Sequence, residues 1–170
     1  MPILTPTNRQ EPPQVKEDGL SSLEQDVAFG YYGPVTGDFL ASARKHYPMI
    51  PVFVTVHGFH DIKRQLEKSG KRFWAYVAED IEFFDNKDLW TALACMINYG
   101  LGAVGLSATS NPTFIKKDLS FKETGWVPGY FMMVDSRKVG HIDISPDLPT
   151  SCLDVAYSLA IKATGYALGI

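Results

Sequence analysis

The sequence predicts an α+β protein with a mixed β-sheet, flanking helices, a C-terminal helix and an extended N-terminal arm. Amphipathic helical stretches alternate with apolar strand-like runs in the first part of the chain, and short strand-like runs joined by turns follow. With 170 residues, 45% apolar and 21% charged, the chain is long enough for one domain with a substantial core. We divide it into an arm, residues 1–20, and a single domain, residues 21–170.

Each expected element has a local signal. A capping-box pattern at Ser21 and Glu24 predicts a short helix, and glycine and proline make residues 30–37 a turn. Helices end at the residue before Pro48, at Gly70 and at Gly100. The expected helices are residues 38–47, 61–70, 86–100 and the C-terminal stretch after Pro149. The expected strands are residues 49–59, 71–84, 103–108, 121–126, 129–135 and 141–145, and the apolar run at 49–59 is expected in the centre of the sheet.

Residues 1–20 cannot form a core of their own. They contain four prolines, which lack a backbone donor, and they show little apolar periodicity. Ordering such a segment costs roughly 1–2 kcal/mol per residue, so we expect a neighbouring subunit to supply the contacts. The expected interaction residues are Pro2, Ile3, Leu4, Thr5, Pro12 and Pro13.

The C-terminal stretch Ser158–Ile170 resembles the active-site helix of metzincin-type zinc peptidases. The shared framework residues are Ala160, Gly165, Ala167, Leu168 and Gly169. Lys162, Ala163 and Tyr166 stand at the positions of the first His, the Glu and the second His, so this helix cannot hold zinc as a peptidase does. An alanine stripe at positions 156, 160, 163 and 167 is equally typical of a helix that packs closely on another element.

Other motifs are compatible with chemistry but have simpler explanations. His57 and His60, three residues apart, are weak candidates for a metal site, with His141 or Asp143 as a further ligand. The run Gly100–Gly105 matches a dinucleotide-binding pattern but follows a helix and precedes a strand, so it reads as a helix end and a turn. The adjacent carboxylates Glu79 and Asp80 are read as a bend or bulge.

The composition disfavours some classes of binding partner. A net charge of −3 disfavours nucleic acid and anionic membranes as partners, and we find neither a signal peptide nor a membrane-spanning run. We expect no cofactor and place the protein in the cytoplasm or a virion. The resulting hypothesis is a non-catalytic assembly subunit, rather than an enzyme, that uses its arm to form a homo- or hetero-oligomer. By analogy it would be a virion or tail component of a tailed phage. The alternative is an enzyme or metal-binding relative of a metzincin-like fold with unrecognised active-site residues.

Overall fold

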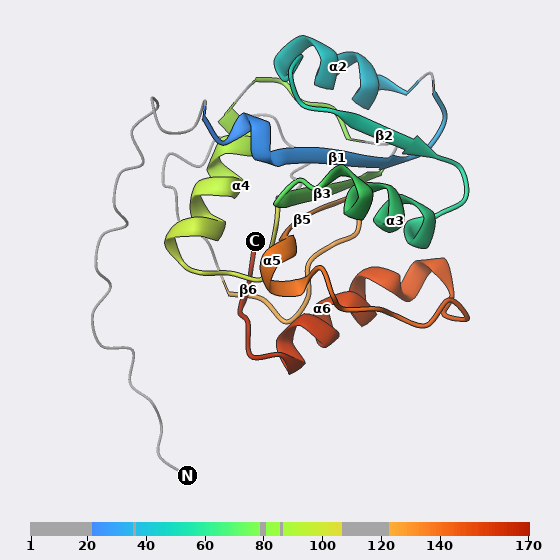
Figure 1. Ribbon diagram of the computed structural model, residues 1–170, viewed down its shortest axis with the longest axis vertical. Coiled ribbons are helices and arrows are strands. Elements are labelled where there is room, and N and C mark those ends of the chain that lie inside the picture. The colour runs from blue at the N-terminus through green and yellow to red at the C-terminus, as the bar shows by residue number, and fades with distance from the viewer. Residues whose placement is uncertain (1–21, 36, 79–80, 86, 107–122) are drawn as a thin grey trace.

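The computed structural model describes residues 22–35, 37–78, 81–85, 87–106 and 123–170. These residues form one six-stranded mixed sheet with helices on both faces (Figure 1), which confirms the predicted α+β fold. The strands are β1 (Val27–Tyr32), β2 (Val52–Thr55), β3 (Phe73–Ala78), β4 (Ala103–Gly105), β5 (Phe131–Asp135) and β6 (Leu168–Gly169). The helices are η1 (Glu24–Asp26), α2 (Asp38–His46), α3 (Phe59–Ser69), α4 (Lys87–Asn98), α5 (Ser136–Val139), η2 (Thr150–Cys152) and α6 (Leu153–Ala163).

The strand order is β2-β1-β3-β5-β4-β6. Strands β2, β1 and β3 are parallel, β5 is antiparallel to both of its neighbours, and β6 runs parallel to β4. The chain passes from β1 to β2 on one side and then crosses to β3 on the other side, so the direction of winding reverses between β1 and β3. In open α/β sheets, ligands bind outside the carboxyl ends of the strands at such a point of reversal.

Two apolar clusters cover the two faces of the sheet. One face packs against α2 and α4 through side chains such as Phe29, Phe39 and Leu93. The other face packs against α3 and α6 through side chains such as Ile62, Leu66 and Tyr157. Successive strand residues point to opposite faces, so β1 and β3 contribute to both clusters and are buried along nearly their whole length.

Four local expectations were wrong. Residues 27–32 form strand β1 rather than the end of a helix and a turn, and β2 lies at the edge of the sheet rather than in its centre. Residues 141–145 form no strand, and of residues 121–126 the described part contributes only an isolated bridge between Glu123 and Gly169. The remaining elements lie within or close to their expected ranges, except that α5 was not expected and that β6 lies in the C-terminal stretch expected to be helical.

The expected interaction arm, including Pro2, Ile3, Leu4, Thr5, Pro12 and Pro13, lies outside the described residues. Within the part of the chain that the structure describes, no helix combines the length and the apolar character needed to cross a membrane.

Candidate functional site

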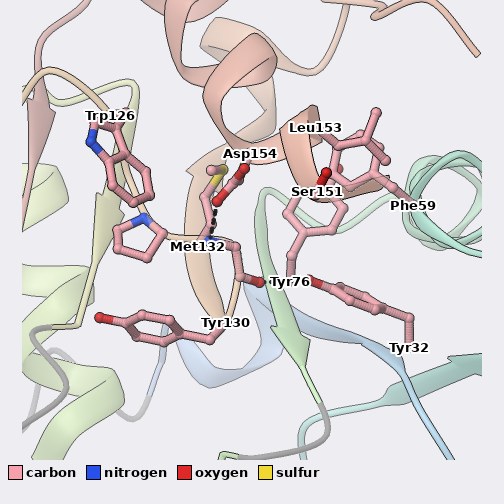
Figure 2. Close-up of a pocket in the computed structure, with 11 residues that line it drawn as sticks. Tyr32, Phe59, Tyr76, Trp126, Tyr130, Met132, Ser151, Leu153 and Asp154 are labelled. Carbon is pink, nitrogen blue, oxygen red and sulfur yellow. Dashed lines mark hydrogen bonds between the residues drawn. The ribbon is translucent and has the colours of Figure 1, made fainter. Parts of the chain in front are cut away.

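A pocket of about 400 Å³ opens at the sheet edge where the parallel strands end. Tyr32 is the last residue of β1, and Phe131, which begins β5, pairs with Val77 near the end of β3. The loop that leads into β5 therefore lies beside the reversal between β1 and β3. The residues that line the pocket are Tyr32, Phe59, Tyr76, Trp126, Pro128, Gly129, Tyr130, Met132, Ser151, Leu153 and Asp154 (Figure 2).

Aromatic side chains form the wall on the β1, β3 and α3 side. Tyr76 of β3 stacks on Phe59 at the start of α3, with ring centroids 4.7 Å apart and an interplanar angle of 28°. Tyr157 of α6 contacts the edge of Phe59 at 5.4 Å. Burial raises the pKa of the Tyr76 hydroxyl well above its usual value, and that of Tyr157 is raised for the same main reason. Neither phenol ionises near neutral pH.

The opposite wall is the loop 126–130, which hydrogen bonds hold in place at several points. The Val127 amide donates to Ser158 Oγ at 3.0 Å, and the Tyr32 hydroxyl donates to the Gly129 carbonyl oxygen at 2.6 Å. At the end of the loop, the Tyr130 hydroxyl donates to the carbonyl of Leu106 at 2.9 Å. Residues from β1, from α6 and from the position after β4 therefore fix one short loop.

Asp154 places a carboxylate in the pocket. It is the second residue of α6, an eleven-residue helix whose amino end faces the loop and favours negative charge. Asp154 Oδ2 accepts a hydrogen bond from the Gly129 amide at 3.0 Å, and Oδ1 accepts one from the Val155 amide at 2.8 Å. Among the described residues that line the pocket, Asp154 alone carries a carboxylate. Each oxygen keeps a further lone pair, so this carboxylate can accept a proton or a hydrogen bond from a ligand.

The histidines proposed as metal ligands lie at the junction of β2 and α3. His57 is exposed, and His60 lies half-buried in the first turn of α3 with its ring edge-on to Phe59. Of the two further candidates, His141 is exposed and Asp143 forms an ion pair with Lys63 at 2.9 Å. Across the described ranges, no group of three or more His, Cys, Asp or Glu side chains could hold a metal ion.

The glycine-rich run is a helix end followed by a strand, as its order in the sequence predicted. Helix α4 ends at Asn98, Gly100 has a φ of 65°, and β4 begins at Ala103. Of the carboxylate pair considered above, Glu79 and Asp80 follow β3 in the sequence and lie outside the described residues.

The metzincin resemblance fails on the local structure. Helix α6 ends at Ala163, Gly165 has a φ of 91°, and Leu168–Gly169 pair with β4 as strand β6. The window that matched the zinc helix is therefore a helix end, a turn and a strand. Lys162 and Ala163 are exposed at the end of the helix, and Tyr166 lies between the turn and β6.

No protein-family model and no curated protein matches the sequence. Solved structures share the fold, among them a mannosyltransferase and a viral protein. Mannosyltransferase PcManGT from Pyrobaculum calidifontis, in complex with GDP-Man and Mn2+, matches with a TM-score of 0.61 and 11% identity over 84% of this chain. The match covers 53% of that protein, so this chain spans about half of its length. The viral protein A197 from STIV matches with a TM-score of 0.54 and 14% identity, over 84% of this chain and 80% of its own.

These neighbours correct two predictions. Neither of them is a metzincin, so the resemblance of residues 158–170 does not reflect a shared fold. The hypothesis of a non-catalytic assembly subunit, with its phage virion role, rested on the absence of recognised chemistry. It is overturned by a neighbour that is a mannosyltransferase, which favours the enzyme alternative without its metzincin part.

Sequence reasoning missed the residues that line the pocket. Asp154, Trp126, Tyr76 and Tyr130 are not among the candidate site residues that the sequence predicts. The available signal was the loop of residues 126–130, in which Pro128 and Gly129 stand between two aromatic residues, together with a carboxylate at the start of the last helix.

Proposed function

We propose that the protein is an enzyme that transfers a glycosyl group from a nucleotide-sugar donor to an acceptor hydroxyl, with Asp154 as the general base. The observation that carries the proposal is the position of the Asp154 carboxylate. It lies in an aromatic-lined pocket at the carboxyl edge of the parallel strands, on a fold shared with a mannosyltransferase bound to GDP-Man. Concave sites with apolar walls and a few convergent polar groups are typical of small-molecule binding.

The chemistry needs a group that removes the acceptor proton. As the acceptor oxygen attacks the anomeric carbon, the bond from that carbon to the donor phosphate breaks, and the nucleoside diphosphate leaves with the electron pair. The proton of the acceptor hydroxyl passes to the Asp154 carboxylate. The hydrogen bond from the Gly129 amide orients this carboxylate before the reaction.

The described residues contain no cluster of three potential ligands that could hold an ion such as the Mn2+ of the mannosyltransferase structure. The proposed proton transfer to Asp154 does not pass through a metal. The carboxylates Glu79 and Asp80 lie outside those residues, and their contribution is tested separately by Asp80→Asn with and without Mn2+.

The first test separates donor binding from transfer. Binding of GDP-Man and a panel of UDP-sugars is measured by calorimetry, and release of the nucleoside diphosphate is measured with methyl pyranosides as acceptors. Asp154→Asn should lower the release rate by about 100-fold or more, as expected for loss of a general base, while donor affinity is unchanged. Asp147→Asn, an exposed carboxylate on the segment before α6, is the matched control and should behave as wild type. Failure of the wild-type protein to bind any nucleotide sugar of the panel would refute the proposal.

A further inference from the structure

Trp126 presents an aromatic face to the pocket. Its side chain is 47% exposed, and within the described ranges its ring stacks on no other aromatic ring. In the view of Figure 2, Trp126 and Tyr130 lie on one side of the Asp154 carboxylate, and Tyr32 and Tyr76 lie on the other. The pocket therefore combines flat apolar walls with a carboxylate between them.

The Trp126 platform is held before any ligand arrives. The Trp126 carbonyl oxygen accepts a hydrogen bond from Thr124 Oγ1 at 2.9 Å, and the next amide, that of Val127, is bonded to the buried Ser158. Pro128 restricts the backbone of Val127 to extended conformations. Because the loop is already ordered, a ligand that stacks on Trp126 loses little conformational entropy on binding.

A pyranose ring matches this arrangement. One of its faces is made of C–H groups, which suit the negative face of an aromatic ring, and hydroxyl donors surround its rim. The Asp154 carboxylate accepts hydrogen bonds from such hydroxyls. An alkyl chain would gain the apolar contact, but it would shield the remaining lone pairs of the Asp154 carboxylate from water and offer them no donor, which costs free energy.

We infer that the pocket is the acceptor subsite and that it takes a neutral sugar ring stacked on Trp126, so the acceptor of the reaction is a carbohydrate. The inference rests on the proposed function, because only a transferase has an acceptor. The binding of a sugar ring to this pocket can nevertheless be measured without a donor. Trp126 is then a specificity-determining residue, and Asp154 contacts the hydroxyl that is glycosylated.

The test uses the fluorescence of Trp126. The other tryptophans are Trp74, which is 4% exposed, and Trp90, which is half-buried against Tyr47 on the opposite face of the sheet. The full-length protein is titrated with the methyl pyranosides of mannose, glucose, galactose and N-acetylglucosamine, and with tetramethylammonium as a cationic probe. At least one glycoside should give a saturable change in emission that Trp126→Phe abolishes and Trp90→Phe leaves intact.

Calorimetry with the same glycoside gives the affinity. Trp126→Ala should weaken binding by about tenfold or more, whereas Trp126→Phe, which keeps an aromatic face, should retain most of it. A fold measurement by circular dichroism accompanies each variant. The inference is wrong if no glycoside of the panel binds, if Trp126→Ala binds as well as wild type, or if tetramethylammonium alone is bound.

The outcomes separate the two proposals. Donor binding without glycoside binding would remove the carbohydrate acceptor and leave the proposed glycosyl transfer standing. Glycoside binding that depends on Trp126, without binding of any nucleotide sugar, would support the sugar subsite and refute the transferase.

Discussion

At the scale of single residues, glycines decide how closely elements approach each other. Gly30 in β1 faces α3, and a Cβ at this position would lie 2.7 Å from Leu66 Cδ1 and 2.8 Å from Ile62 Cγ1. Gly129 has the same role at the pocket, where a Cβ would lie 3.1 Å from Asp154 Cβ. The first glycine sets the distance between a helix and the sheet, and the second leaves space for the carboxylate.

Gly30→Ala should destabilise the fold by about 1–3 kcal/mol, because α3 or its two side chains must move away from β1. Urea unfolding followed by circular dichroism measures the change. Gly125→Ala is the control, since no atom lies within 4 Å of the Cβ it adds. Equal stability of the two variants would show that α3 is not packed tightly on Gly30.

Gly129→Ala should lower the rate of glycosyl transfer while donor affinity stays the same. The added methyl group lies 3.3 Å from Asp154 Oδ2 and displaces the carboxylate from its hydrogen bond with the amide. Nucleoside diphosphate release and calorimetry provide the two readouts. A matching loss of donor affinity would contradict the assignment of Gly129 to the acceptor side.

At the scale of elements, an ionic cluster joins α3 to the segment before α6. The Lys63 side chain is only 5% exposed and reaches the carboxylates of Glu67 and Asp143. Burial alone would lower the pKa of Lys63, but its hydrogen bonds to both carboxylates outweigh this effect and the pKa is raised. The hydrogen bond from Lys63 lowers the pKa of Asp143. The cluster therefore ties the helix that carries Phe59 to the segment that leads to Asp154.

The pKa directions fix the sign of a pH dependence. Because the pKa of Asp143 is depressed in the folded state, its contribution is fully present above its unfolded pKa of about 4 and is lost as pH falls through the folded value. The raised pKa of Lys63 keeps the contribution until pH rises towards the alkaline range. Asp143→Asn should cost less than about 1 kcal/mol at neutral pH, since Asp143 is exposed and the attraction is screened.

The measurement is urea unfolding of wild type and Asp143→Asn at about pH 3, 5 and 7, values that bracket the usual pKa of an aspartate. The difference between the two proteins should be present at the two higher values and shrink at the lowest. Asp147→Asn controls for the loss of a surface carboxylate. A difference that grows as pH falls would contradict the pairing of Asp143 with Lys63.

The helices α2, α3 and α4 could be predicted because each has an amphipathic repeat and an end signal within its own sequence. Strand β1 could not, because Tyr31, Tyr32, Gly33 and Pro34 have a strong local turn signal, whereas the two tyrosines belong to a strand buried from both sides. The position of β2 at the edge depends on pairing between distant segments, and so does the strand β6 that follows α6. Local patterns do not determine such contacts.

The pocket was beyond the reach of local patterns for the same reason. Its residues come from β1, α3, β3, the loop before β5, β5 itself, η2 and the start of α6. No sequence motif contains both Tyr32 and either Trp126 or Asp154, because these residues are far apart in the chain. A carboxylate near a helix start also has a structural explanation, which the sequence alone favours. Only the fold shows that Asp154 reaches across to Gly129.

At the scale of the whole molecule, the core is built on both faces of a single sheet. The described members of the two apolar clusters lie between residues 23 and 168. Strand β2 lies at one edge of the sheet and β6 at the other, so segments far apart in the sequence form the two edges of one sheet. The described elements run from Glu24 to Gly169, and the division into an arm, residues 1–20, and a domain, residues 21–170, stays a prediction.

Deleting residues 1–20 should leave the domain folded, with a thermal transition within a few degrees of that of the full chain. The reason is that the clusters on both faces of the sheet remain complete among the described residues. Circular dichroism melts of the two proteins provide the measurement. A fall in the transition temperature by about ten degrees or more, equivalent to roughly 2.5–5 kcal/mol in a domain of this size, would contradict the proposed domain boundary.

The antiparallel direction of β5 gives the protein a modular layout. The chain enters β5 beside the carboxyl end of β3, leaves it at the opposite edge of the sheet, and returns to the pocket at the start of α6. As a result, the loop with Trp126 and the carboxylate of Asp154 belong to one continuous stretch, while Tyr32, Phe59 and Tyr76 belong to the parallel half. If the protein is the glycosyltransferase proposed above, we expect that exchanging this single stretch, from the loop through α6, changes its acceptor preference while the strands that precede the loop keep their sequence.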